Sequence, residues 1–182
     1  MFINRNRYPG DSVEPRFVPH PFTGQAPVPT PAIANPKTYT GSCHCGAITV
    51  AMTTKGALPE GGEDVLECDC SICTRNGTVL IYPTPDQVSI TNEAGLTSYS
   101  FGRKFQTHDF CSTCGVAIRL KKLDVGEERW KAEHPTVDYA KEHLNSMPLN
   151  LRIFEGVEWE DIKIPRGNWS KRGPKYVCPD PE

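Results

Sequence analysis

The 182-residue chain lacks any long apolar run. No stretch approaches the roughly 20 consecutive apolar residues that a membrane-spanning helix requires. The first seven residues, MFINRNR, do not form the apolar core of a secretory signal. We therefore expect a protein that has no membrane partner and lies in the reducing cytoplasm.

The chain also lacks a strong charge of one sign. Its formal net charge is −2 at pH 7, and no long stretch is rich in lysine and arginine. Proteins that bind nucleic acid usually carry a basic patch that neutralises phosphates. The small basic cluster formed by Lys171, Arg172 and Lys175 lies in a C-terminal tail, residues 171–182, where solvation explains it. We expect no nucleic-acid partner.

Proline, in contrast, is abundant and concentrated near the N-terminus. Residues 1–38 are rich in proline and show no sustained apolar period, which favours extended, polyproline-like backbone. Two interpretations stay open for this arm. It is either disordered, or an extended arm packed on the domain through Tyr8, Phe17 and Phe22.

Short alternating patterns of apolar and polar residues dominate the domain expected over residues 39–170. Alternation with a period of two is typical of half-buried strands. The sequence therefore predicts an all-β fold. The expected strands cover residues 47–52, 78–82, 87–91, 98–101, 116–121 and 149–153.

A helical insertion over residues 124–147 interrupts the strands. Residues 127–133 favour a helix that ends before Pro135, and Thr136 could cap a second short helix. Trp130 and Tyr139 would either border a pocket or pack in the core. We expect the insertion to influence which substrate is accepted, because insertions between strands commonly determine specificity.

Seven of the eight cysteines fall into three tight clusters, which is the most informative feature of the sequence. One or two residues between thiols is the spacing of metal knuckles, and in a reducing compartment metal ligation is favoured over disulfides. A disulfide framework is the alternative, although a Cys-x-Cys pair would form a strained ring. The clusters are Cys43/Cys45, Cys68/Cys70/Cys73 and Cys111/Cys114.

Seven thiols divide naturally into one site with four ligands and one with three. A structural zinc takes four protein ligands, whereas a catalytic zinc takes three and keeps one position open. The first and third clusters each end in glycine and precede an apolar strand, so together they could complete a Cys₄ site. The middle cluster would then hold an open zinc, to which a substrate thiol is a natural fourth ligand.

These clusters, in this order, resemble the glutathione-dependent formaldehyde-activating enzyme family, also called the centromere protein V/GFA domain. The resemblance covers roughly residues 39–165. The matching stretches are Gly41-Ser42-Cys43-His44-Cys45-Gly46, Cys68-x-Cys70-x-x-Cys73, His108-x-Phe110-Cys111-x-x-Cys114-Gly115, Asn150-Leu151-Arg152 and Glu155-Gly156-Val157.

The resemblance implies a zinc-bearing β-tent of small antiparallel sheets with two zinc ions per chain. Cys43, Cys45, Cys111 and Cys114 would hold the structural zinc, and Cys68, Cys70 and Cys73 the catalytic one. It further implies a carbon–sulfur lyase that joins glutathione, as co-substrate, to formaldehyde and yields S-hydroxymethylglutathione. Thiolate stabilisation and aldehyde polarisation are chemistry that zinc supplies.

Three further residues are candidates for the reaction. His108 could transfer a proton or orient a ligand, since histidine is the commonest acid or base near neutral pH. Arg75 and Arg103 could bind the carboxylates of glutathione. A solvated position is the alternative for both arginines.

The chain departs from the family pattern in its proline-rich arm, its helical insertion and its tail with Cys178. These additions leave room for an electrophile larger than formaldehyde. The alternative function is a zinc-stabilised interaction module without turnover, as in centromere protein V. A basic extension would favour that alternative, but the arm of this chain is weakly charged.

Overall fold

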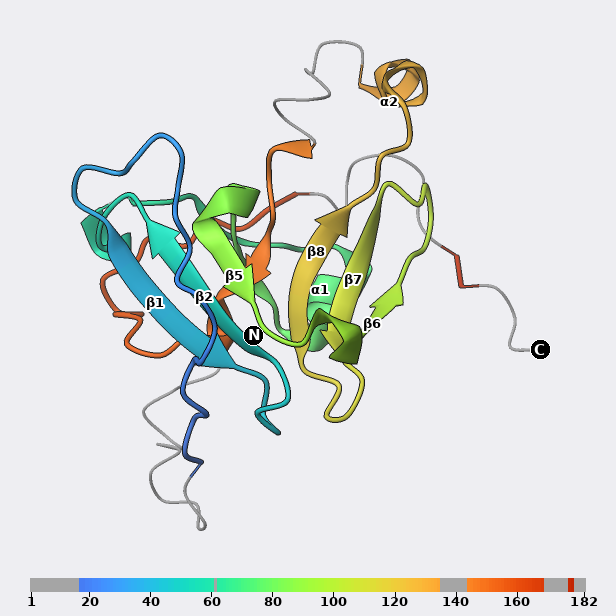
Figure 1. Ribbon diagram of the computed structural model, residues 1–182. Helices are drawn as coiled ribbons and strands as arrows, with labels where there is room; N and C mark the ends of the chain where they lie inside the picture. Colours follow the sequence, from blue (N-terminus) through green and yellow to red (C-terminus); the bar gives the residue numbers. More distant parts are fainter. Residues whose placement is uncertain (1–16, 61, 135–143, 169–176, 179–182) are drawn as a thin grey trace.

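The computed structural model describes residues 17–60, 62–134, 144–168 and 177–178. They form two antiparallel sheets (Figure 1), so the prediction of an all-β fold of small antiparallel sheets is confirmed. The smaller sheet has the order β1-β2-β5, with β1 Lys37–Ser42, β2 Thr49–Thr54 and β5 Val88–Ile90. The larger sheet has the order β3-β4-β9-β8-β7-β6, with β3 Val65–Glu67, β4 Val79–Ile81, β9 Leu149–Asn150, β8 Ala117–Lys122, β7 Gln106–Cys111 and β6 Leu96–Tyr99.

The main hydrophobic core draws on both sheets. Val50 and Met52 of β2 are fully buried in the same cluster as Ile81 of β4, Ile118 of β8 and Leu149 of β9. Fully burying a side chain of this size contributes about 1.5–3 kcal/mol to folding. The core therefore holds the two sheets, and the loops at their ends, in a fixed relation.

The predicted strand at residues 149–153 is wrong in its second half. Only Leu149–Asn150 pairs as β9, and Leu151–Ile153 forms a 3₁₀ turn. The side chain of Asn150 accepts a hydrogen bond from the backbone N–H of Arg152 at 3.2 Å. This local bond competes with a sheet ladder, as asparagine side chains commonly do.

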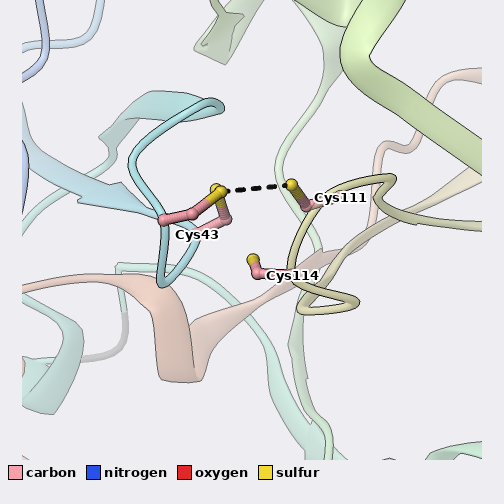
Figure 2. A group of neighbouring side chains, drawn as sticks. Cys43, Cys111 and Cys114 are labelled. Carbon is pink, nitrogen blue, oxygen red and sulfur yellow. Dashed lines mark hydrogen bonds between the residues drawn. The ribbon is translucent and has the colours of Figure 1, made fainter.

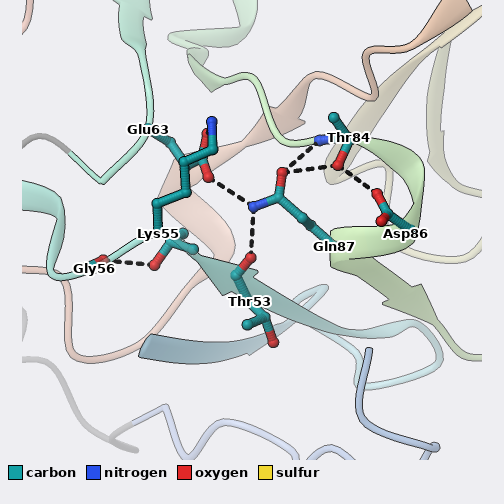
Figure 3. A network of polar contacts seen from close by, with 8 residues as sticks. Thr53, Lys55, Gly56, Glu63, Thr84, Asp86 and Gln87 are labelled. Carbon is teal, nitrogen blue, oxygen red and sulfur yellow. Dashed lines mark hydrogen bonds and ion pairs between the residues drawn. The ribbon is translucent and has the colours of Figure 1, made fainter. Parts of the chain in front are cut away.

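A buried glutamine fixes the start of β5 against the smaller sheet (Figure 3). Gln87 is 2% exposed, and its amide donates to the Thr53 carbonyl at 2.8 Å and to Glu63 at 2.7 Å. Its side-chain oxygen accepts from the backbone N–H of Thr84 at 2.8 Å. Because a buried amide without partners would be costly, this network ties β2, β5 and the segment before β3 together.

The described part of the N-terminal arm packs on the domain. Phe17 stacks on His44 with ring centroids 5.2 Å apart. The ring of His20 lies so close to Gly46 that a Cβ there would come within 2.1 Å of it. The arm from residue 17 onward therefore fits the packed interpretation, whereas Tyr8 lies outside the described residues.

The insertion begins with the expected helix, α2 Glu127–Glu133. Trp130 is buried and packs against Phe105 at 5.5 Å, in a small cluster with Val125 and Leu144. Trp130 therefore belongs to a core rather than to a pocket. Tyr139 lies outside the described residues, and so does the second expected helix except for its end at Leu144. Across the described part of the chain, no helix is both long and apolar enough to cross a membrane.

Candidate metal centres and an adjoining cavity

Two hairpin turns bring four thiols together. Cys43 and Cys45 lie between β1 and β2, Cys111 ends β7, and Cys114 lies in the turn before β8. The sulfurs of Cys43, Cys111 and Cys114 point toward one region in Figure 2. The Sγ atoms of Cys43 and Cys45 are 3.6 Å apart, and those of Cys45 and Cys111 are 3.7 Å apart. Four sulfurs about 2.3 Å from a tetrahedral zinc would be about 3.8 Å apart, so the spacing fits such an ion.

Both turns depend on a glycine with left-handed backbone. Gly46 has φ +74° and donates to the Cys43 carbonyl at 3.0 Å; Gly115 has φ +73° and donates to the Cys111 carbonyl at 2.9 Å. Residues with a Cβ rarely adopt this conformation. The backbone N–H of Ile48, just after the first of these turns, donates to the Cys43 sulfur at 3.3 Å.

The environment of this four-thiol centre favours a bound cation. Burial raises the pKa of the Cys43 thiol to about 12. For Cys114, burial acts to raise the pKa, but hydrogen bonds from the backbone N–H groups of Val116 and Cys45 have the larger effect. The pKa of Cys114 is therefore lowered to about 6. A cation among the four sulfurs would stabilise all the thiolates. The centre can therefore hold a metal ion.

The second centre is built around the start of helix α1, Ser71–Asn76. Cys70 is the residue before the first helical position, Cys73 lies inside the helix, and Cys68 follows β3. All three sulfurs lie within 4.8 Å of one another. Sequence patterns predicted the thiols but not this helix, which has only six residues.

Charge in this three-thiol centre concentrates on Cys70. Hydrogen bonds from the Cys68 and Cys73 thiols lower the pKa of Cys70 to about 2. The hydrogen bond between Cys68 and Cys70 in turn raises the pKa of Cys68 to about 11. Cys68 and Cys73 are buried, whereas Cys70 is half-buried. Among the described residues, no histidine, acid or further cysteine joins the group. A metal ion bound here would keep a position for a ligand from outside.

A cavity of about 330 Å³ lies beside the three-thiol centre, with Cys73 in its wall. It extends between the larger sheet and α1, and reaches the turn of the four-thiol centre at Gly115. The residues lining it are Ile72, Cys73, Asn76, Thr78, Leu80, Tyr99, His108, Asp109, Phe110, Gly115, Ala117, Arg119, Leu120 and Asn150.

His108 places an imidazole in the wall of the cavity. It is 8% exposed and its ring stacks on Phe101 at 5.6 Å. Burial lowers the pKa of His108, although the Cys70 thiolate and Asp109 raise it in part. The imidazole is therefore neutral at pH 7, the state in which a histidine can accept a proton.

The lowered pKa predicts a specific pH dependence of stability. Because the pKa of folded His108 lies below the unfolded value of about 6.5, the unfolded state binds more protons in acid. The contribution of His108 is thus complete above about pH 6.5 and is lost as the pH falls toward the folded pKa. We expect His108→Gln to flatten this dependence, measured by urea unfolding between pH 5.5 and 8. An imidazole that titrates above 6.5 by NMR would contradict the prediction.

A buried ion pair that sequence reasoning missed forms another part of the cavity wall. Arg119 of β8 donates to Asp109 of β7 at 2.8 Å and to Glu93 at 2.7 Å. Ser98 and Thr107 also donate to Asp109, each at 2.7 Å. Burial raises the pKa of Asp109, but these hydrogen bonds outweigh it and hold the pKa below its usual value. Only the strand register that places Asp109 opposite Arg119 could have revealed the pair.

The two arginines predicted to bind glutathione lie outside the cavity wall. Arg75 is exposed near the end of α1, and its guanidinium donates to the Ser71 carbonyl at 2.7 Å. Arg103 is exposed, and its guanidinium lies over the Phe105 ring at 5.4 Å. Their roles stay predictions. Arg75 lies on the helix that carries Cys73, whereas Arg103 lies in the loop between β6 and β7.

Comparison with known proteins agrees with this architecture. A crystal structure of a Rhodobacter sphaeroides protein is 24% identical and superimposes with a TM-score of 0.52, over 99% of that chain and 70% of this one. That likeness shows the fold. Residues 38–147 match the family described as "Glutathione-dependent formaldehyde-activating enzyme". Because this match spans more than half of the sequence, the chain belongs to the glutathione-dependent formaldehyde-activating enzyme family.

Proposed function

We propose that the protein is a zinc-dependent carbon–sulfur lyase that acts on a glutathione adduct. Its nominal reaction joins glutathione and formaldehyde to give S-hydroxymethylglutathione. The observation that carries this proposal is the three-thiol centre of Cys68, Cys70 and Cys73, which has no fourth ligand among the described residues and adjoins a cavity through Cys73. The two cysteine groups support the proposal of two zinc ions per chain.

We assign each residue of the centre and the cavity a role in this reaction. Cys68, Cys70 and Cys73 would hold zinc, which when bound favours the thiolate form of a coordinated thiol. The glutathione sulfur attacks the carbonyl carbon, the carbon–oxygen π bond opens, and the thiol proton ends on the oxygen. His108 lies in the cavity wall, is neutral at pH 7, and is the group we assign to that proton transfer.

Arg75 and Arg103 are proposed to bind the carboxylates of glutathione. Both are exposed, so each contact would be screened by water and would contribute at most about 1 kcal/mol. This fits a peptide whose charged ends remain in solvent. The free thiols of all eight cysteines suit the cytoplasm, which we propose as the compartment.

The proposal is tested by calorimetric titration of glutathione into the zinc-loaded protein. NMR exchange spectroscopy with formaldehyde follows. We expect one glutathione per chain and accelerated exchange between free and adduct formaldehyde. His108→Gln should slow the exchange but retain glutathione binding. Zinc-loaded protein that binds no glutathione would refute the proposal and favour the interaction module instead.

A further inference from the structure

The cavity beside Cys73 is larger than formaldehyde requires. Its volume is about 330 Å³, whereas an apolar cavity of about 150 Å³ is already large enough to hold benzene. Formaldehyde has only two heavy atoms. Space therefore remains for a substituent the size of a substituted aromatic ring or a chain of about six carbons.

The wall of the cavity is mostly apolar and comes from several elements. Ile72 lies on α1, Leu80 on β4, and Ala117 and Leu120 on β8. Tyr99 of β6, which is 44% exposed, adds an aromatic ring to the wall. Side chains of this kind bind alkyl or aryl groups, because burial removes apolar surface from water.

The charges in the wall argue against glutathione itself as the occupant. Asp109 and Arg119 are paired with each other at 2.8 Å, and Arg119 also pairs with Glu93. Within the described lining, no other arginine, lysine or acid is present. Burying the two carboxylates of glutathione here would leave them without an unengaged cation, which is costly. The peptide should therefore lie outside, with only what is bonded to its sulfur inside.

We infer that the cavity binds an apolar substituent of the electrophile, an alkyl chain of about six carbons or an aromatic ring. The physiological substrate is then an aldehyde RCHO, or its glutathione adduct, rather than formaldehyde alone. A carbon–sulfur bond forms, the carbonyl π bond breaks, and the thiol proton moves to oxygen, so no further reactant is needed. The inference rests on the proposed function, because it requires the glutathione sulfur at the three-thiol centre.

The test measures binding rather than turnover. Glutathione, S-methylglutathione and S-hexylglutathione are titrated separately into the zinc-loaded protein. Each methylene buried should tighten binding by about three- to fourfold. We therefore expect S-hexylglutathione to bind at least tenfold more tightly than S-methylglutathione, even though both lack the thiol.

Two variants locate the effect. Ala117→Leu occupies part of the cavity and should reduce the advantage of the hexyl group by about threefold or more, the contribution of at least one buried methylene, with glutathione affinity unchanged. Ala34→Leu is the matched control, because Ala34 is exposed in the arm and lies outside the cavity wall. If Ala117→Leu fails to fold, Tyr99→Ala replaces it, since removal of a half-exposed ring spares the core.

The outcomes separate the two proposals. Equal affinities for the methyl and hexyl derivatives, with glutathione bound, would overturn the apolar site and leave the proposed function intact. A hexyl advantage that Ala117→Leu, or Tyr99→Ala in its place, leaves undiminished would also overturn it. Failure of glutathione and both derivatives to bind would refute the proposed function and this inference with it.

Discussion

Cys114→Ser is expected to unfold the domain. The four-thiol centre joins the β1–β2 turn to the β7–β8 turn, and a hydroxyl is a poor ligand for zinc. Structural zinc in small domains contributes about 10–16 kcal/mol of apparent binding free energy, as much as the whole stability of a typical domain, about 5–15 kcal/mol. We expect loss of the cooperative transition in thermal unfolding followed by circular dichroism.

Cys178→Ser is the matched control for this substitution. Cys178 is exposed in the tail and is in neither thiol group, so the same atomic change there should leave stability within about 0.5 kcal/mol. A Cys114→Ser protein that unfolds at the wild-type temperature would show that the four-thiol centre is dispensable for folding.

Cys70→Ser is expected to abolish glutathione binding and to leave the fold intact. Cys70 is half-buried beside a centre with only three protein ligands, so a metal ion there shares its coordination with solvent or substrate. Loss of one of three thiolates should remove about one zinc equivalent, measured by elemental analysis. Glutathione affinity should fall by at least 100-fold, because the two thiols that remain are too few to hold the ion.

Mild chelation of the wild-type protein should reproduce this result. We expect one zinc equivalent to leave first, glutathione binding to disappear, and the circular dichroism spectrum to stay unchanged. Simultaneous loss of both ions together with unfolding would contradict the division into a structural and a catalytic centre.

The thiol groups could be predicted because their ligands are close in sequence. Cys68, Cys70 and Cys73 span six residues, so almost any backbone path keeps their sulfurs near one another. The pairing of Cys43 with Cys111 needed the additional information of two similar glycine turns, each before an apolar strand. The family resemblance then gave the same division.

The cavity could not be predicted, because its wall comes from separate strands. β7 begins with Gln-Thr-His-Asp, and without apolar alternation in these residues the sequence does not predict a strand. Its Asp109 is buried because β8 supplies Arg119 opposite it. Such compensation depends on tertiary pairing, whereas the predicted strands each showed their own apolar period.

The four-thiol centre also has a consequence for how the chain folds. Its two ligand pairs come from different sheets, and Cys45 and Cys111 are 66 positions apart. Closing a loop of this length restricts the unfolded chain substantially, as a cross-link would. Contacts so distant in sequence form slowly. An ion bound first by Cys43 and Cys45 would then need to bind Cys111 and Cys114, and this step would position the larger sheet against the smaller one. The availability of the metal ion would then determine the folding rate as well as the final stability.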